Sequence, residues 1–296
     1  LGNVELVDIN NMRTKHKKLT FTKMRGTGND YLYFDCFDQT VESPESLAVR
    51  LSNRRTGVGS DGIVLIMPST IADAKMRMFN ADGTEGSVAG NALRCVCKYL
   101  YENGHVRKAE MAVETGSGVK TAKLFIREDQ VFSVLVDMGC PAFAPAKIPV
   151  KLDGDRVMMR PVFLAGEKRE ISCVSMGNPH VVIFVEDVNR IPLEQVGPQI
   201  ETDSLFPERV NVSFAQIVDK NDIVMRVWER GIGETAACGT GACAVAVAAV
   251  ENGFCTRGAD IDVRLPGGTL VVRYQEDGKV WLTGDANTDF TGTIEI

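Results

Sequence analysis

One cysteine lies at a point in the sequence where its own chemistry would change. Cys238 precedes Gly239 and Thr240 in "ETAACGTGACAVAVAAVENG", residues 234–253, where a helical pattern begins. A helix N-terminus presents unpaired N–H groups and roughly half a positive charge, and small residues let an anion approach them. The same field lowers the pKa of a thiol, which then serves as base or nucleophile. The stretch predicts an anion site beside a reactive thiol; a small buried cysteine after a tight turn is the alternative.

A second stretch has the same plan without the cysteine. "EGSVAGNALRCVCKYLYENG", residues 85–104, also begins with Glu, has Gly five residues on and ends in Glu-Asn-Gly. Gly90 and Asn91 open its helical pattern, and Ala89 stands where the later stretch has Cys238. Two such helix ends facing each other would form a strong carboxylate site that needs no metal.

The two stretches are part of an internal repeat with an offset of 149 residues. Residues 76–104 align with 225–253 without a gap and are identical at 8 of 29 positions. The same offset relates Gly28 and Asn29 to Gly177 and Asn178. Because matching residues recur at the same offset in separate parts of the chain, we predict two copies of one fold, each of about 120–150 residues.

Each copy reads as strand-rich, with a single helix late on. Runs such as "HVVIFVED" and "NDIVMRVW" are typical of strands, and the helical patterns end near Gly104 and Gly253, the usual left-handed stop. The second helix is apolar nearly all round, which indicates burial on every side. We predict an α+β protein of two pseudo-symmetric lobes. Each is a curved, mostly antiparallel or mixed β-sheet around a central helix, with the active site in the cleft between them.

The expected boundaries follow from the repeat. Residues 20–135 form the N-terminal lobe, which 284–296 complete, and 136–283 form the C-terminal lobe. The start "LGNVELVDINN" lacks both an initiating Met and an apolar segment of the secretory kind, so we do not expect a secretory signal. We expect residues 1–19 to be an extension of vector origin, with Met12 as the natural start.

Composition excludes several classes of function. The chain has 296 residues, is 44% hydrophobic and 24% charged, and carries a net charge of −6, which argues against binding to nucleic acid or an anionic membrane. No apolar run reaches the roughly 18–20 residues of a membrane span. Three scattered histidines offer no metal cluster, and we expect the eight cysteines to be reduced.

Further polar residues lie beside Gly, Pro or strand ends in both copies. Each has a plain structural alternative as a turn residue, a surface charge or a hydrogen-bonding histidine. Their arrangement in two related sets favours a site, and they are Asn29, Asn80, Asn178, His180, Asn211, Glu229 and Arg230.

These residues resemble the successive motifs of the diaminopimelate epimerase family. The resemblance runs in order from about Phe21 to the C-terminus, through "FTKMRGTGNDYLYFD", "RRTGVGSDGIVLI", "MRMFNADGTEGSVAGNALRC", "MGNPHVVIFVED", "RVNVSF" and "VWERGIGETAACGTGACA". The last of these, combined with "FNADGTE", is highly specific. The resemblance implies a cofactor-independent, two-lobed enzyme.

The chemistry that the resemblance implies uses two cysteines on opposite faces of the substrate α-carbon. A thiolate removes the α-proton and a thiol returns a proton to the other face, because one group cannot reach both faces. Without pyridoxal, paired helix dipoles must stabilise the carbanion. The resemblance places Gly90, Asn91, Gly239 and Thr240 around the α-carboxylate.

The remaining roles also come from the resemblance. Asn80, Asn211 and Arg230 would bind the distal carboxylate, and Glu229 would pair with a distal ammonium. At the reacting end, the expected residues are Asn29 and Asn178 lining the site, with His180 and Glu229 setting the protonation of the thiols. This set favours diaminopimelate over a simple amino acid.

Position 89 departs from the family pattern. The family motif reads Cys-Gly-Asn, whereas this chain has Ala89, which has no titratable atom. We interpret the chain as an epimerase in which Ala replaces the first catalytic Cys and disables the two-thiol mechanism. The alternatives are a natural one-thiol racemase or isomerase of another amino acid, and a non-catalytic amino-acid-binding homologue. The second alternative predicts erosion of Cys238, His180 and Glu229, which are all present.

The resemblance also sets the expected partners. The substrate is a small molecule, diaminopimelate, and exposed strands would allow a homodimer. An enzyme of lysine biosynthesis is expected in the cytoplasm, or in the plastid stroma of a plant.

Overall fold

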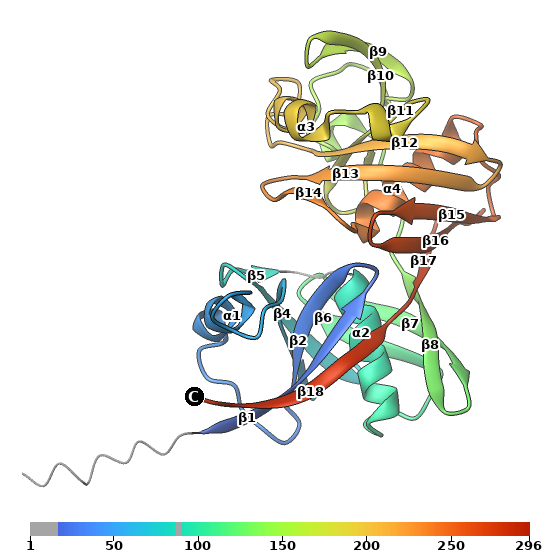
Figure 1. Cartoon of the computed structure of the whole chain (residues 1–296). Helices are drawn as coiled ribbons and strands as arrows, with labels where there is room; N and C mark the ends of the chain where they lie inside the picture. Colours follow the sequence, from blue (N-terminus) through green and yellow to red (C-terminus); the bar gives the residue numbers. More distant parts are fainter. Residues whose placement is uncertain (1–16, 87–89) are drawn as a thin grey trace, which may run out of the picture.

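The structure of the protein is a computed structural model, which describes residues 17–86 and 90–296. It consists of two strand-rich lobes, one above the other in Figure 1. This confirms the expected α+β class, and a mixed sheet runs through both lobes. None of the helices in the described part of the chain is long and apolar enough to cross a membrane.

The first lobe contains both ends of the described chain. Its elements are β1 (Lys18–Gly26), β2 (Asn29–Asp35), α1 (Pro44–Ser52), β3 (Gly62–Met67), β4 (Ala74–Asn80), β5 (Glu85–Gly86), α2 (Gly90–Glu102), β6 (Glu110–Thr115), β7 (Gly118–Arg127), β8 (Gln130–Asp137) and β18 (Asn287–Glu295). β18 pairs antiparallel with β1, so that the chain returns to this lobe at its end (Figure 1).

The second lobe is formed by the middle of the chain. Its elements are β9 (Arg160–Leu164), β10 (Glu167–Ser175), β11 (Pro179–Phe184), α3 (Leu193–Glu201), β12 (Asn211–Asp219), β13 (Asp222–Glu229), β14 (Gly233–Thr235), α4 (Gly239–Glu251), β15 (Asp260–Leu265), β16 (Gly268–Tyr274) and β17 (Val280–Gly284), with short 3-10 helices at Pro145–Lys147 and Val188–Arg190.

The lobes repeat each other element by element. The bounds of α1 and α3, and those of α2 and α4, are each displaced by the offset of 149 residues. β2 pairs parallel with β3 as β11 does with β12, while most other pairs are antiparallel. β8 of the first lobe pairs antiparallel with β17 of the second, which joins the two halves of the sheet.

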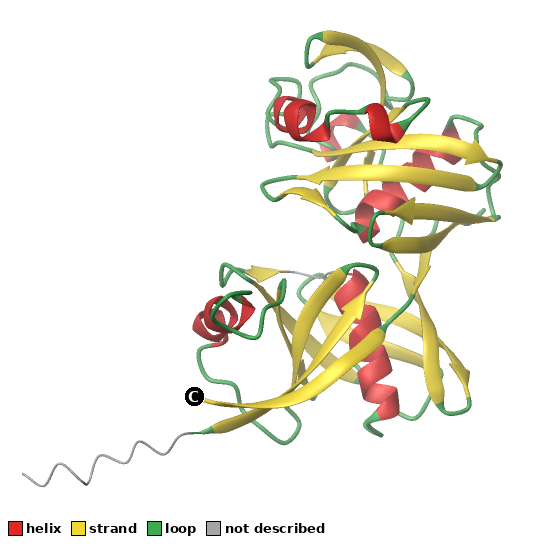
Figure 2. Ribbon diagram, in the orientation of Figure 1, coloured by secondary structure: helices red, strands yellow, loops and turns green. Residues whose placement is uncertain are grey.

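A helix forms the core of each lobe. α2 and α4 lie inside the curved strands of their lobes (Figure 2), and each belongs to a large cluster of buried apolar side chains. α4 is a run of Ala, Val and Cys that is buried from Gly241 to Ala249, because the sheet surrounds it. Gly104 and Gly253, with φ of +81° and +79°, follow the two helices in the left-handed conformation that favours glycine.

One sequence expectation about the elements is wrong. Each lobe holds a second α-helix, α1 or α3, where we expected only one. Both have nine residues and pack a few apolar side chains on the outside of the sheet; Leu47, Ala48 and Leu51 are the buried ones of α1. A stretch of two and a half turns shows too little periodicity to be recognised as a helix.

Candidate active site

The starts of α2 and α4 meet between the lobes. A Cβ added to Gly239 would lie 3.2 Å from Leu282 Cδ2 and 3.7 Å from Asn91 Oδ1, and one added to Gly90 would lie 3.5 Å from the same Leu282 atom. The two helices are also in contact with each other. Leu282 of β17 therefore lies beside both helix starts, which brings the first turns of α2 and α4, with their unpaired N–H groups, into the same region.

Cys238 caps the first turn of α4. Its Sγ accepts a hydrogen bond from Gly241 N at 3.4 Å and lies 3.6 Å from Thr240 Oγ1. These donors favour a thiolate, but burial, and then the nearby Glu229 carboxylate, raise the pKa of Cys238 well above its usual value. The expected lowering of this pKa is therefore wrong, because burial of a side chain that is only 5% exposed outweighs the hydrogen bonds of Thr240 and Gly241.

Glu229 lies beside the Cys238 sulfur. It ends β13, accepts a hydrogen bond from Thr235 Oγ1 at 2.5 Å and forms a second one with the Cys238 thiol. Burial raises the pKa of Glu229, against the opposite effect of these two hydrogen bonds. A carboxylate with a raised pKa beside a thiol is suited to accept the thiol proton.

His180 reaches the sulfur only through other side chains. Its Nε2 lies 3.0 Å from Asn178 Oδ1, and Asn178 Nδ2 donates to Thr240 Oγ1 at 3.2 Å. Thr240 in turn contacts Cys238. Complete burial, with the nearby charge of Arg230, lowers the pKa of His180 to about 3, so its imidazole is neutral.

The first lobe has a corresponding chain of hydrogen bonds. Asn91 Nδ2 donates to Asn29 Oδ1 at 2.6 Å, and Asn29 Nδ2 donates to Asp61 Oδ2 at 3.1 Å. Asp61 pairs with Arg54 at 2.9 Å. Among the described residues, the buried Oδ1 of Asn91 has no hydrogen-bond partner, so an acceptor faces the start of α4. Sequence reasoning did not single out Asp61 or Arg54, although both stand in the quoted "RRTGVGSDG".

The residues expected at the distal end come from both lobes. Arg230 N donates to Asn211 Oδ1 at 2.9 Å, and its exposed guanidinium donates from Nη1 to Glu208 O at 3.0 Å. Asn211 is paired with His180 in the register of β11 and β12. Asn80 belongs to the other lobe and donates to Thr84 Oγ1 at 2.9 Å.

Position 89 lies outside the described residues, which resume at Gly90. Nothing in the geometry above depends on it. No group of three or more His, Cys, Asp or Glu side chains among the described residues is arranged to hold a metal ion.

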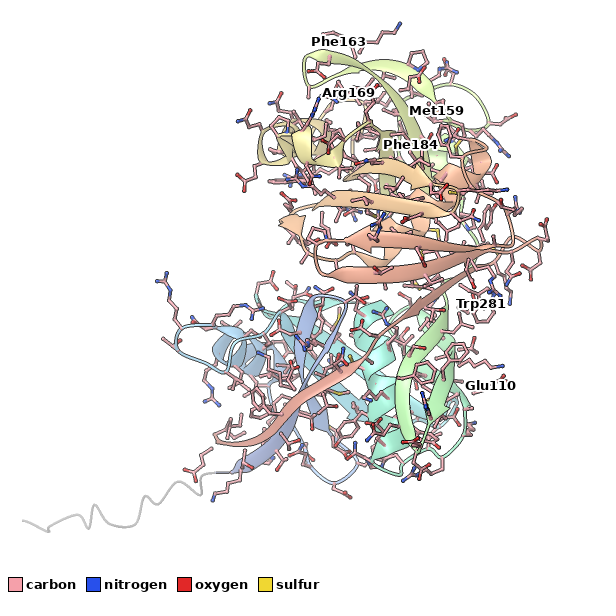
Figure 3. All side chains as sticks on the ribbon, turned by 45° about the vertical axis from the view of Figure 1, so that its right-hand side comes forward. Glu110, Met159, Phe163, Arg169, Phe184 and Trp281 are labelled. Carbon is pink, nitrogen blue, oxygen red and sulfur yellow. The ribbon has the colours of Figure 1, made fainter. Side chains whose placement is uncertain are left out.

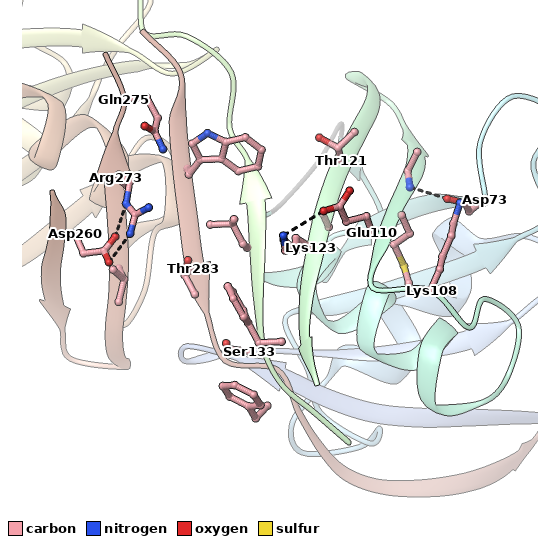
Figure 4. A pocket seen from close by; sticks show the side chains of 18 residues that line it. Asp73, Lys108, Glu110, Thr121, Lys123, Ser133, Asp260, Arg273, Gln275 and Thr283 are labelled. Atoms are coloured by element: carbon pink, nitrogen blue, oxygen red, sulfur yellow. Dashed lines mark hydrogen bonds and ion pairs between the residues drawn. The ribbon is translucent and has the colours of Figure 1, made fainter. Parts of the chain in front are cut away.

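A hollow of about 950 Å³ lies elsewhere, on the outer side of β6–β8 and β15–β17. Glu110 and Trp281 lie on this side in Figure 3. Its charged side chains pair with one another, as in Lys123–Glu110 at 3.2 Å and Arg273–Asp260 at 2.6 Å (Figure 4). None of its described lining residues is a cysteine or a histidine. We therefore place the candidate reaction at the helix starts and not in this hollow.

Comparisons with known proteins relate the whole chain to one family. The family model of diaminopimelate epimerase matches residues 21–144 and 172–288. A diaminopimelate epimerase from Desulfovibrio desulfuricans is 49% identical over 285 residues, and one from Acetivibrio thermocellus is 48% identical over 279; each match covers 94% of this chain and 99% of the relative. A solved phenazine biosynthesis protein of the PhzF family from Bacillus anthracis shares the fold, with a TM-score of 0.69, 19% identity and coverage of 95% of this chain and 100% of that one.

Proposed function

This chain belongs to the diaminopimelate epimerase family, and we propose that its site is built to convert LL-2,6-diaminopimelate to the meso isomer without pyridoxal. The reaction removes the proton of one α-carbon and returns a proton to the opposite face. The family's product serves lysine biosynthesis.

The meeting of the two helix starts is the observation that carries the proposal. The substrate α-carboxylate accepts hydrogen bonds from the N–H groups at Gly90 and Asn91 on one side and at Gly239 and Thr240 on the other. As the α-proton leaves, negative charge moves onto this carboxylate. Fixed N–H groups and helix dipoles then bind the transition state more strongly than the ground state.

Cys238 acts on one face of the α-carbon. In the site described above its thiol is protonated, because burial and Glu229 raise its pKa. The substrate α-ammonium brings a positive charge beside the sulfur, which favours the thiolate. Glu229 takes the thiol proton, and the Cys238 thiolate is then free to remove the α-proton of the substrate.

The opposite face needs a proton donor at position 89. The methyl group of Ala89 cannot supply one, and we propose that this chain is therefore a disabled epimerase. Cys238 and Glu229 are present, and so are the hydrogen bonds that link His180 through Asn178 to Thr240. Their presence favours this interpretation over a homologue that has lost its chemistry. It leaves the natural one-thiol enzyme as the competing hypothesis.

The distal carboxylate is assigned to Arg230, Asn211 and Asn80. A guanidinium binds a carboxylate through two parallel hydrogen bonds, and Arg230 has this group at an exposed position, with its backbone N–H bound by Asn211 Oδ1. Pairing of Glu229 with a distal ammonium is not part of the proposal, since its carboxyl group is hydrogen-bonded to Thr235 and Cys238.

We also propose a homodimer that acts in the cytoplasm, or in the plastid stroma of a plant. Light scattering of the purified chain tests the oligomeric state: a mass near 32.3 kDa would contradict the dimer.

Binding tests the proposed function directly, because replacing Cys by Ala leaves the helix starts and the distal residues in place. We expect calorimetry to detect binding of LL- or meso-diaminopimelate to the chain. Failure of both isomers to bind would contradict the proposal.

A further inference from the structure

A buried acid, Glu201, is the last residue of α3. Glu201 is 5% exposed. Its Oε2 accepts a hydrogen bond from Trp228 Nε1 at 2.7 Å, and its Oε1 accepts one from Gly231 N at 2.8 Å. Oε1 also accepts a longer hydrogen bond, of 3.5 Å, from Arg209 Nη1. A buried carboxylate is costly unless it is paired, and here all its partners belong to β13, the turn after it and the loop before β12.

The turn that Glu201 holds carries Arg230. The backbone N–H of Arg230 donates a hydrogen bond to Asn211 Oδ1. The next backbone N–H, that of Gly231, donates to Glu201 Oε1. Gly231 has a φ of +77°, which few residues other than glycine adopt. Two side chains therefore fix the backbone on both sides of the Arg230 Cα, while the guanidinium stays exposed with one bond to Glu208 O.

Close packing keeps Glu201 in this place. A Cβ added to Gly197 would lie 2.7 Å from ring atoms of Trp228, so α3 approaches the indole as only glycine allows. Gly197 and Glu201 are four residues apart and share one face of α3. The ring that packs on Gly197 thus presents its N–H to the Glu201 carboxylate.

The first lobe lacks both the arginine and the acid. The offset of 149 residues relates Arg230, Glu201, Arg209 and Trp228 to Ala81, Ser52, Ser60 and Phe79. There Ser60 Oγ donates to Ser52 Oγ at 3.1 Å. The same fold is therefore built without a buried carboxylate at this point. The acid occurs in the lobe that presents an arginine to the ligand.

We infer that Glu201 is a positioning residue for the distal-carboxylate site, acting through the turn at Gly231 and touching no ligand itself. This inference rests on the proposed function, which assigns that carboxylate to Arg230. A preorganised turn presents the guanidinium in its binding orientation before the ligand arrives, so less ordering is needed on binding. The role concerns the distal carboxylate only, and the α-carbon end of the ligand should not respond to it.

The substitution Glu201→Gln tests the inference with little change in shape. Glutamine has one acceptor oxygen, so its NH₂ must face either the Trp228 or the Gly231 N–H, and one of these loses its partner. We expect the affinity for meso-diaminopimelate to fall about tenfold, which corresponds to about 1.4 kcal/mol. L-Lysine, which has the same carbon chain without the distal carboxylate, should bind as before.

NMR titration of the full chain measures both ligands, including weak binding. Ser52→Ala, the equivalent position of the first lobe, is the matched control and should change neither affinity. Arg230→Met should weaken diaminopimelate alone, and adding Glu201→Gln to it should cause no further loss. Trp228→Phe keeps the ring on Gly197 and should give a smaller loss in the same direction, which keeps the test valid if Glu201→Gln does not fold.

The results for the Glu201 and Arg230 variants distinguish a failure of the positioning role from a failure of the proposed function. Equal weakening of both ligands by Glu201→Gln, or no weakening of either, overturns the positioning role. If Arg230→Met affects the two ligands alike, or if the unchanged chain binds no diaminopimelate, the proposed distal site is wrong and the inference fails with it.

Discussion

Thr240 and Glu229 should move the reactivity of Cys238 in opposite directions. The Thr240 hydroxyl forms a hydrogen bond with the sulfur and lowers the pKa of Cys238, whereas the Glu229 carboxylate raises it. Thr240→Val removes the hydroxyl at nearly the same volume, so the pKa should rise. Glu229→Gln removes the negative charge, so the pKa should fall.

The size of the first effect follows from the contact. A hydrogen bond to a charged group contributes about 1.5–3 kcal/mol, and the 3.6 Å distance between Cys238 Sγ and Thr240 Oγ1 puts this one at the lower end. That corresponds to about one pKa unit. Below the pKa, the thiolate fraction falls tenfold for each unit by which the pKa rises. Alkylation of Cys238 should therefore be about tenfold slower in Thr240→Val at a given pH, and faster in Glu229→Gln.

Peptide mass spectrometry after timed treatment with iodoacetamide measures this rate between pH 7 and 10. The exposed Cys140 in the same chain is the internal reference and should react alike in all variants. Changes of the same sign in the two variants, or rates at Cys238 equal to those of the unchanged chain, would refute the electrostatic account of the site.

Three further predictions concern stability and chemistry. Burial raises the pKa of Cys95 to about 11 and that of Cys243 to about 12. Folding therefore favours the protonated thiols, and the full contribution to stability is present below about pH 8.5. It is lost at higher pH by up to about 1.4 kcal/mol per thiol and pH unit. Tm should be lower at pH 10 than at pH 8, with a smaller drop in Cys95→Ala. Arg94 is fully buried and donates to Asp285 O at 3.0 Å where the chain re-enters the first lobe, so Arg94→Met should lower the free energy of unfolding by about 1–3 kcal/mol in urea titration, and an unchanged midpoint would contradict this. In D₂O the chain should exchange the α-proton of one stereoisomer without inverting it, as followed by NMR, and Cys238→Ala should abolish that exchange; inversion by the unchanged chain would disprove the need for a second thiol.

Much of the fold could be predicted because the repeat is written in the sequence. The spacing between the two Glu-Asn-Gly endings relates α2 to α4, and the glycine-rich starts indicate where these helices begin. α1 and α3 could not be predicted in the same way. Their helical state depends on a few apolar side chains packing on the sheet, and a nine-residue pattern does not reveal such packing.

The site could be predicted only as a set of residues. Gly90, Gly239 and Cys238 have a local signal, because small residues and a thiol precede helical patterns. The raised pKa of Cys238 has no local signal in the sequence, because it results from burial in the folded chain. Asp61 and Glu201 were missed for a related reason: each acts by binding another polar group, and their partners become visible only in the folded structure.

The conversion of LL- to meso-diaminopimelate, measured for this chain and for Ala89→Cys side by side, tests the central claim most directly. Ala89→Ser is the matched control, since its hydroxyl has nearly the size of a thiol but is far less acidic. We expect the unchanged chain and the Ser variant to be inert, and Ala89→Cys to convert the substrate unless Cys238→Ala is added. An inert Cys variant, or an unchanged chain that already turns over, would contradict the two-thiol mechanism proposed for this site.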